Sequence, residues 1–400
     1  MLTDTGFFRS TSTALSEILA PFDPAEFRAS VWGRRPLVVP GPDTKFAALF
    51  SFGSLNRILN QSSFPHPTTK LNKDGRTLHA SSPAGLIRHV KDGATLVLEN
   101  AERYDVTVAG FLDRLSSELC FSTRANVYFS QPRQQGYQNH YDTHDFFILQ
   151  VEGEKEWFIF SATVEEPLFV QKHHGMTPPP QSELVMRCTL RKGDVLYVPK
   201  GMWHYACATE QPSVHLTIAL FQRTGIDFLT WLVDELRDDV TFRRRFPLVT
   251  REELPSERDA PHPFSAHVEA LATALTTRLR DHTLAERYTQ FVFASLPRHQ
   301  SFGFPGQVYE LDLSPSTTLA VTHRAFLKQR DGSTVSYTGY ARVLRFDASL
   351  ERVVDQIFAS ECVSGDALRT SNPAITEETV LAVLKLLATH GFVVPHPSSA

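Results

Sequence analysis

The residues best suited to chemistry in this chain are two histidines and an aspartate in two separate segments. His140 and Asp142 stand two positions apart, so on a β-strand both side chains point to one face. His204 supplies a second imidazole further along the chain. Two imidazoles and one carboxylate on one side of a metal make the facial triad of non-haem Fe(II) oxygenases, which leaves open positions for a chelating cosubstrate and dioxygen.

The alternative is that His140 and Asp142 are a polar pair on a surface strand, because this spacing also arises by chance. The context favours metal ligands. The apolar run 146–150, the turn around Gly153 and the run 157–160 predict a β-hairpin, so the histidine–aspartate pair opens a strand.

Two further features support a metal site. His204 follows a Gly193-Asp194 turn and the strand-like run 195–199. Lys155 lies on the return arm of the predicted hairpin, and a cation there can hold the far carboxylate of a dicarboxylate cosubstrate that chelates the metal with its other end.

The chain has 400 residues, so two or three domains are expected. A hydrophobic content of 42% and a charged content of 21% are typical of a soluble globular protein, and the net charge of −4 argues against a nucleic-acid partner. No segment has the length of a signal peptide or a transmembrane helix. The cysteines lack CxxC spacing, which argues against disulfides and a cysteine zinc site and favours a reducing, cytoplasmic location; they are Cys120, Cys188, Cys207 and Cys362.

The first half of the chain carries mostly strand patterns. Between residues 96 and 220 short apolar runs alternate with turn signals, which predicts a β-sandwich or barrel. The elements expected in this half are a helix at 15–19 and strands at 37–39, 94–98, 126–130, 195–199 and 214–221.

The second half is expected to be mainly helical. Apolar residues recur at helical spacing in 228–236, 268–279 and 285–293. Near the end, strands at 319–321 and 341–344, helices at 350–359 and 376–390, and a strand at 392–394 resemble a winged-helix module. Thr376 is the candidate N-cap of the last helix and Gly391 its stop.

Segments 136–157, 193–204 and 213–217 together resemble the signature of the JmjC-type ribosomal oxygenases, a family of cupin-like protein hydroxylases. The resemblance implies an α+β protein with a double-stranded β-helix (jelly-roll) core. It implies a JmjC/cupin-like catalytic domain over 1–225, a helical dimerisation domain over 226–300 and a winged-helix-like domain over 301–400.

The same resemblance implies roles for individual residues. His140, Asp142 and His204 would bind Fe(II), and Lys155 would hold the C5 carboxylate of 2-oxoglutarate, with dioxygen as the third reactant. The residues that would line the cosubstrate pocket are Asn126, Tyr128 and Thr217.

The chain departs from the family around the metal. Gln138-Asn139 precede the histidine where family members often have proline, and His144 replaces an apolar or tyrosyl residue. We expect His144 to line the pocket, because a fourth protein ligand would take a position that the cosubstrate needs. His215 is expected to be a core or pocket-lining histidine. The residues assigned to the substrate pocket are Tyr137, Gln138, His144 and His215.

Other candidates are weaker. His173 and His174 are expected in a solvated loop, and Arg243-Arg244-Arg245 at a solvated helix end or an interface rather than in a nucleic-acid patch. The stripe of apolar residues in the first helix of the middle domain is expected to form a homodimer interface by analogy with the family, with packing inside one chain as the alternative. The stripe comprises Phe228, Leu229, Leu232 and Leu236.

The expected reaction is an Fe(II)- and 2-oxoglutarate-dependent hydroxylation of an amino-acid side chain in a protein or peptide, with a ribosomal protein as the family's usual substrate. One alternative is a hydroxylase of a peptide natural product or a free amino acid. Another is a catalytically inactive cupin-like binding scaffold, which the intact triad and Lys155 disfavour. A cupin-type isomerase or dioxygenase fits poorly, since those sites usually add a glutamate and lack the lysine.

Overall fold

The chain divides into two compact units. The computed structural model describes residues 13–61, 64, 68–171, 177–254, 262–298, 302–324 and 326–396. One unit is formed by Met1–Gln222 with Leu296–Ala400, and the other by Arg223–Ser295. Within the described residues, no helix combines the length and apolar character needed to cross a membrane.

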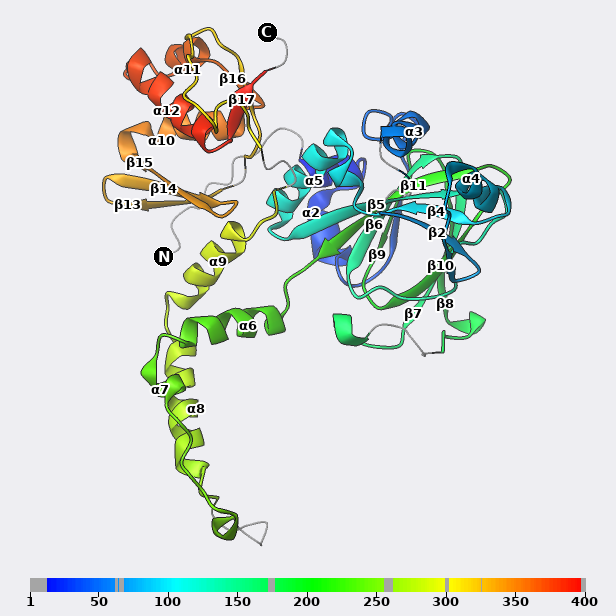
Figure 1. The fold of residues 1–400 in the computed structure, drawn as a ribbon, viewed down its shortest axis with the longest axis horizontal. Coiled ribbons are helices and arrows are strands. Elements are labelled where there is room, and N and C mark those ends of the chain that lie inside the picture. Colours follow the sequence, from blue (N-terminus) through cyan, green and yellow to red (C-terminus); the bar gives the residue numbers. More distant parts are fainter. Residues whose placement is uncertain are drawn as a thin grey trace. The chain divides into compact units, whose positions relative to one another are not determined.

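Two antiparallel sheets form the core of the first unit (Figure 1). The larger sheet contains, in spatial order, β1 (Leu37–Val39), β9 (Val195–Val198), β6 (Asp145–Glu152), β11 (Ser213–Phe221), β5 (Ser122–Ser130), β4 (Thr95–Leu98), β2 (Thr69–Lys73) and β3 (Arg76–Leu78). The smaller sheet contains β10 (Met202–Ala208), β7 (Lys155–Ala162) and β8 (Leu184–Leu190).

The two faces of β6 explain how the sheets are packed. Phe146 and Ile148 belong to an apolar layer that also contains Trp157 and Ile159 of β7, so this layer joins the two sheets. The intervening Phe147 and its neighbours at alternate positions pack on the other side, into the cluster beneath the helices. This alternation follows from the period of two in a β-strand, and the two facing sheets with an apolar layer between them form a double-stranded β-helix.

The predicted β-hairpin between β6 and β7 is wrong. β6 pairs with β9 and β11, whereas β7 pairs with β8 and β10 in the other sheet. Gly153, at φ +64°, therefore turns the chain from one sheet to the other rather than back along the same sheet. The sequence pattern of two strands and a tight turn is the same in both cases, and only long-range pairing distinguishes them.

Helices cover the outer face of the larger sheet. They are α1 (Ala14–Leu19), α2 (Pro24–Glu26), the π-helical turn η1 (Phe27–Val31), α3 (Phe52–Gln61), α4 (Pro83–Lys91), the 3-10 turn η2 (Ala101–Arg103) and α5 (Val106–Leu119). Two 3-10 turns, η3 (Phe169–Gln171) and η4 (Gln181–Glu183), lie between β7 and β8. The prediction of strands through most of 96–220 missed α5, whose first turn is capped by the Asp105 carboxylate.

The second unit contains helices. They are α6 (Gly225–Leu236), α7 (Val240–Arg243), the 3-10 turn η5 (Arg251–Glu253), α8 (Ser265–Leu279) and α9 (Leu284–Ala294). Leu232 and Leu236 of α6 are buried in its core together with Trp231, and Phe228 packs against the same cluster. Leu229 is exposed, so most of the stripe assigned to a dimer interface packs inside this unit instead.

The C-terminal part of the first unit has two small sheets and three helices. β16 (Cys362–Val363), β12 (Leu319–Val321) and β17 (Val393–Pro395) form one sheet, and β13 (Leu327–Asp331), β14 (Thr334–Gly339) and β15 (Arg342–Asp347) form the other. The helical elements are η6 (Ala348–Leu350), α10 (Glu351–Ala359), α11 (Gly365–Ser371) and α12 (Glu377–Thr389). As predicted, Thr376 caps α12 and Gly391 follows it with a positive φ.

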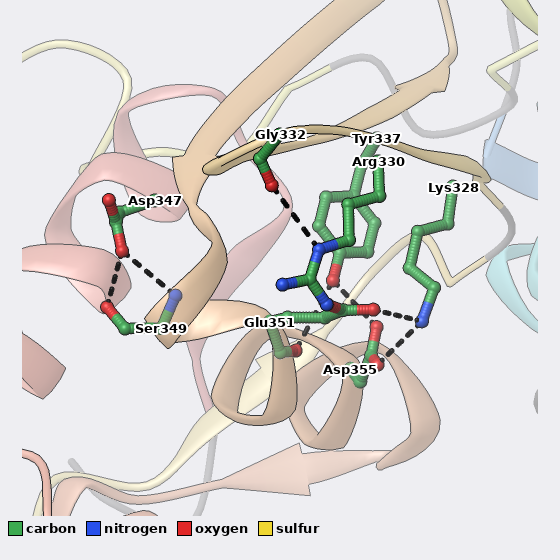
Figure 2. Close-up of polar contacts among 8 residues, drawn as sticks. All are labelled: Lys328, Arg330, Gly332, Tyr337, Asp347, Ser349, Glu351 and Asp355. Carbon is green, nitrogen blue, oxygen red and sulfur yellow. Dashed lines mark hydrogen bonds and ion pairs between the residues drawn. The ribbon is translucent and has the colours of Figure 1, made fainter.

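A network of charged side chains joins the second of these sheets to α10 (Figure 2). The Lys328 ammonium donates hydrogen bonds of 2.9 Å to both Glu351 and Asp355. The Tyr337 hydroxyl donates to the second oxygen of Asp355 at 2.6 Å, and Arg330 pairs with Glu351. Each charge in the network faces an opposite one, so the network fixes β13 and β14 onto the helix.

Candidate metal centre

A backbone pairing brings the two segments of the predicted site together. The His140 amide donates to the His204 carbonyl at 3.1 Å, and the His204 amide donates to the His140 carbonyl at 2.7 Å. A third bond of 2.8 Å runs from the Gly201 amide to the Asp142 carbonyl. The expectation that His140 and Asp142 open a regular strand is wrong, because β6 begins at Asp145. The isolated pairing with His204 positions them instead.

The three side chains converge. One ligand atom from each of His140, Asp142 and His204 lies within 4.8 Å of the others. Nδ1 of His140 lies 2.8 Å from the Gln138 carbonyl, and Nδ1 of His204 lies 3.0 Å from the Met202 carbonyl. A proton on Nδ1 of each ring therefore has an acceptor, which leaves the Nε2 lone pairs for a metal.

Burial keeps His204 neutral. The side chain is 4% exposed, and burial followed by the neighbouring His140 lowers the pKa of His204 to about 3, although Asp142 opposes the shift. A metal binds the deprotonated imidazole, so this environment suits a ligand.

A buried carboxylate fixes the loop before His204. Asp145 accepts a hydrogen bond from the Lys200 amide at 3.0 Å and another from the Tyr197 hydroxyl. That hydroxyl also accepts from the Gly33 amide at 2.8 Å. Sequence reasoning missed Asp145 and Tyr197. The sequence signal for this pair was Asp145, a charged residue at the start of an apolar strand.

Lys155 lies inside the β-helix, at the start of β7. Its side chain is 4% exposed, and its ammonium donates to the Ser130 hydroxyl at 3.0 Å. The Ser130 and Thr95 hydroxyls lie 3.0 Å apart. Burial lowers the pKa of Lys155 to about 8. Among the described residues, no carboxylate forms an ion pair with this ammonium. A buried cation without an anionic partner is costly, so the arrangement suits an anionic ligand.

The residues assigned to the cosubstrate pocket share the inner face of the larger sheet. Thr217 of β11 is the register partner of Asn126 on β5, and His215 is the partner of Tyr128. The Asn126 side chain accepts from the Asn100 amide at 3.0 Å. Burial raises the pKa of Tyr128, whose hydroxyl is also hydrogen-bonded to Asn126.

Ser130 continues this inner face but was not predicted. It follows Tyr128 by two positions, so the strand period alone could have indicated it. Thr95 could not be found in this way, because it approaches Ser130 through the pairing of β4 with β5.

The residues assigned to the substrate pocket lie in two regions. Tyr137, Gln138 and His144 are close in sequence to the metal-ligand candidates, and His215 is buried inside the β-helix. The Tyr137 ring lies 5.7 Å from the His140 ring, and the Gln138 side chain donates to the Asp74 carbonyl at 3.3 Å. Burial raises the pKa of Tyr137 to about 12. His144 packs on Phe221 with ring centroids 4.9 Å apart, and it is not part of the three-residue ligand group.

His215 lies deeper than these residues. Its ring stacks on Tyr128 with centroids 4.9 Å apart and planes 4° apart, inside the β-helix. His173 and His174 lie outside the described residues.

Comparison with known proteins identifies a domain family and several similar proteins. Residues 98–228 match the JmjC domain family. The chain is 30% identical over 248 residues to ribosomal oxygenase 1 of Gallus gallus, which covers 58% of this chain and 41% of the relative. It is 29% identical over 224 residues to a bifunctional lysine-specific demethylase and histidyl-hydroxylase of Drosophila pseudoobscura pseudoobscura, covering 52% and 23%. The chain thus spans less than half the length of these curated relatives.

A solved structure extends the likeness in fold beyond the JmjC domain. The Escherichia coli ribosomal oxygenase YcfD superimposes with a TM-score of 0.57 at 17% identity, covering 94% of this chain and 98% of that one. The chain therefore shares the double-stranded β-helix fold of that structure, and residues 98–228 within it match the JmjC domain family. This similarity agrees with the resemblance to the JmjC-type ribosomal oxygenases that was read from the sequence.

Proposed function

We propose that the protein is an Fe(II)- and 2-oxoglutarate-dependent oxygenase that hydroxylates an amino-acid side chain in a protein or peptide. One observation carries the proposal. The ligand atoms of His140, Asp142 and His204 converge within 4.8 Å in a β-helix that also buries the Lys155 ammonium, which forms no ion pair with a described carboxylate. A metal site and an anion site inside one β-helix fit a cosubstrate that chelates with one end and carries a carboxylate at the other.

The residues fit both absent groups. His140, Asp142 and His204 would hold Fe(II), and Lys155 would hold the far carboxylate of 2-oxoglutarate, with Asn126, Tyr128 and Thr217 along its length. A structure of YcfD is described as a complex with cobalt and 2-oxoglutarate, which supports the assignment. When bound, the metal and 2-oxoglutarate supply activation of dioxygen, coupled to oxidative decarboxylation to succinate.

The chain's own residues would contribute positioning and apolar surroundings. The Nδ1 contacts with Gln138 and Met202 orient the two imidazoles. The Asp145 contacts with Lys200 and Tyr197 hold the segment that carries His204. Phe146 and Trp157 of the apolar layer between the sheets lie against the His204 ring and would keep water from that side of the site.

The substrate is proposed to be a side chain in a ribosomal protein, because the relatives carry the name ribosomal oxygenase. Tyr137, Gln138 and His144 would contact it, since they surround the metal ligands. The departures at Asn139 and His144 keep a peptide natural product or a free amino acid as the second candidate.

The remaining assignments are proposals of the same kind. They are a homodimer built through the helical region 226–300, a winged-helix-like module over 301–400 and a cytoplasmic location. The order α10, β16, α11, α12, β17 supports the winged-helix assignment. The helix α12 has few basic residues, so a nucleic-acid partner is not proposed.

Mass spectrometry of modified proteins tests the function. Purified enzyme with Fe(II), 2-oxoglutarate and air would be incubated with ribosomal proteins and total peptides of a matched extract, with Asp142→Ala as the control. We expect one ribosomal protein to gain a single oxygen only with the wild-type enzyme. Succinate formation driven by another fraction would instead indicate a biosynthetic hydroxylase. Inactivity with every fraction would favour the binding scaffold.

A further inference from the structure

Three buried polar atoms inside the β-helix have no hydrogen-bond partner among the described residues. They are Oε1 of Gln150, Nε1 of Trp157 and Nδ1 of His215. All three side chains are at most 5% exposed. A buried donor or acceptor that stays unpaired is costly, so such atoms indicate a ligand or a bound water. The Gln150 oxygen is only an acceptor and cannot bind an anion. Nε1 of Trp157 and Nδ1 of His215 are nitrogens that can donate a hydrogen bond.

Aromatic contacts hold the His215 imidazole in one orientation. Tyr128 stacks on one face with planes 4° apart, and Trp157 meets the ring at 5.5 Å and 76°. Burial, with Lys155 close by, lowers the pKa of His215 well below its usual value. The ring is therefore neutral, and one of its nitrogens carries a proton that it can donate.

Trp157 lies between the metal-ligand candidate His204 and the buried His215 inside the β-helix. Its ring centroid lies 6.3 Å from that of His204 and 5.5 Å from that of His215. It also shares a face of β7 with Lys155, because the two residues are two positions apart. The indole, the imidazole, the Lys155 ammonium and the Ser130 hydroxyl thus gather donors where no carboxylate of the described chain forms an ion pair.

We propose that His215 and Trp157 complete a carboxylate-binding floor with Lys155, and that this floor selects 2-oxo acids with a second carboxylate over monocarboxylic ones. The inference rests on the proposed function, since it concerns the same cosubstrate. The indole and the imidazole donate to the carboxylate oxygens while the ammonium neutralises their charge. His215 is then a specificity residue of the cosubstrate, not a contact of the hydroxylated substrate.

Calorimetric titration without dioxygen tests this floor. The Co(II)-loaded protein would be titrated with 2-oxoglutarate and with pyruvate, which lacks the second carboxylate. His215→Phe and Trp157→Phe keep an aromatic ring but remove the donor. Each is expected to raise the Kd of 2-oxoglutarate about tenfold or more and to change that of pyruvate by less than about threefold. His215→Asn, which restores an amide near Nδ1, should recover part of the loss.

Two controls separate this inference from the proposed function. His323→Phe replaces another buried histidine in the C-terminal part and should leave both Kd values unchanged. If Lys155→Met does not weaken 2-oxoglutarate binding, the proposed cosubstrate is wrong. If Lys155→Met abolishes the preference but His215→Phe and Trp157→Phe weaken both acids equally or neither acid, then the two residues only pack, and the floor as proposed is wrong.

Discussion

Lys155 is kept in the interior at a cost to stability. Burial lowers its pKa from 10.5 to about 8, so folding works against the charged form. A fall in the pKa of Lys155 from 10.5 to about 8 corresponds to a penalty on the order of 3 kcal/mol at neutral pH. We therefore expect Lys155→Met to raise the free energy of unfolding at neutral pH, as measured by urea denaturation, while weakening cosubstrate binding.

The pH dependence of that gain has a definite sign. The folded-state pKa lies below the unfolded one, so the penalty is complete below about pH 8 and disappears as the pH rises toward 10.5. The stability difference between Lys155→Met and wild type should close over that window. Lys70→Met, at a half-exposed surface lysine, should show neither effect. A less stable Lys155→Met protein at neutral pH would contradict this account.

Single residues were predictable where their signal is local in the sequence. His140, Asp142 and Lys155 lie in one short segment, and His204 follows a recognisable turn and strand. The pairing that brings these two segments together depends on residues far apart in the sequence, so only the structure shows it. His215 was expected near the substrate, because its sequence neighbours do not indicate how deeply it is buried, whereas strand pairing with Tyr128 places it inside the β-helix.

Whether a segment forms a helix or a strand was predicted more often than which strands pair with one another. The strands at 146–150 and 157–160 exist, but they belong to different sheets, because jelly-roll closure depends on pairings far apart in sequence. The helix α5 was missed even though Asp105 offers an N-cap and Val108, Leu112 and Leu115 lie on one helical face. The surrounding strand signals outweighed that pattern.

The turn between β6 and β7 tests how strictly the crossing is fixed. Gly153 has φ +64°, and an added Cβ would lie 1.9 Å from the Pro212 carbonyl oxygen. We expect Gly153→Ala to lower the free energy of unfolding by more than about 2 kcal/mol, because strain and a backbone clash add. Urea denaturation measures the loss.

A matched glycine separates the two contributions. Gly332 has φ +57° but no atom within 4 Å of an added Cβ. Gly332→Ala should therefore cost only the strain, about 1 kcal/mol. Equal losses at Gly153 and Gly332 would mean that the crossing yields to accommodate a side chain, and that Lys155 is not rigidly positioned by it.

At the scale of the whole molecule, the length of the chain indicated several domains, and the change from strand to helix patterns near residue 225 indicated where the two sheets of the β-helix end. The second compact unit, Arg223–Ser295, lies within this helical stretch. The sequence could not indicate which face of α6 is buried inside the second unit. Trp231, Leu232 and Leu236 are buried, and this burial depends on α9, which is distant in the sequence.

The proposed homodimer must therefore use the other face of α6. Ile226, Leu229 and Val233 recur at helical spacing and are 56%, 47% and 56% exposed. Three exposed aliphatic side chains in one row are typical of an interface. We expect Ile226→Glu combined with Val233→Glu to halve the mass measured by light scattering after size exclusion. Leu248→Glu, at a 95% exposed leucine of the same unit, should leave that mass unchanged. A wild-type protein with the mass of one chain would refute the dimer, and a double variant that stays dimeric would move the interface away from this row.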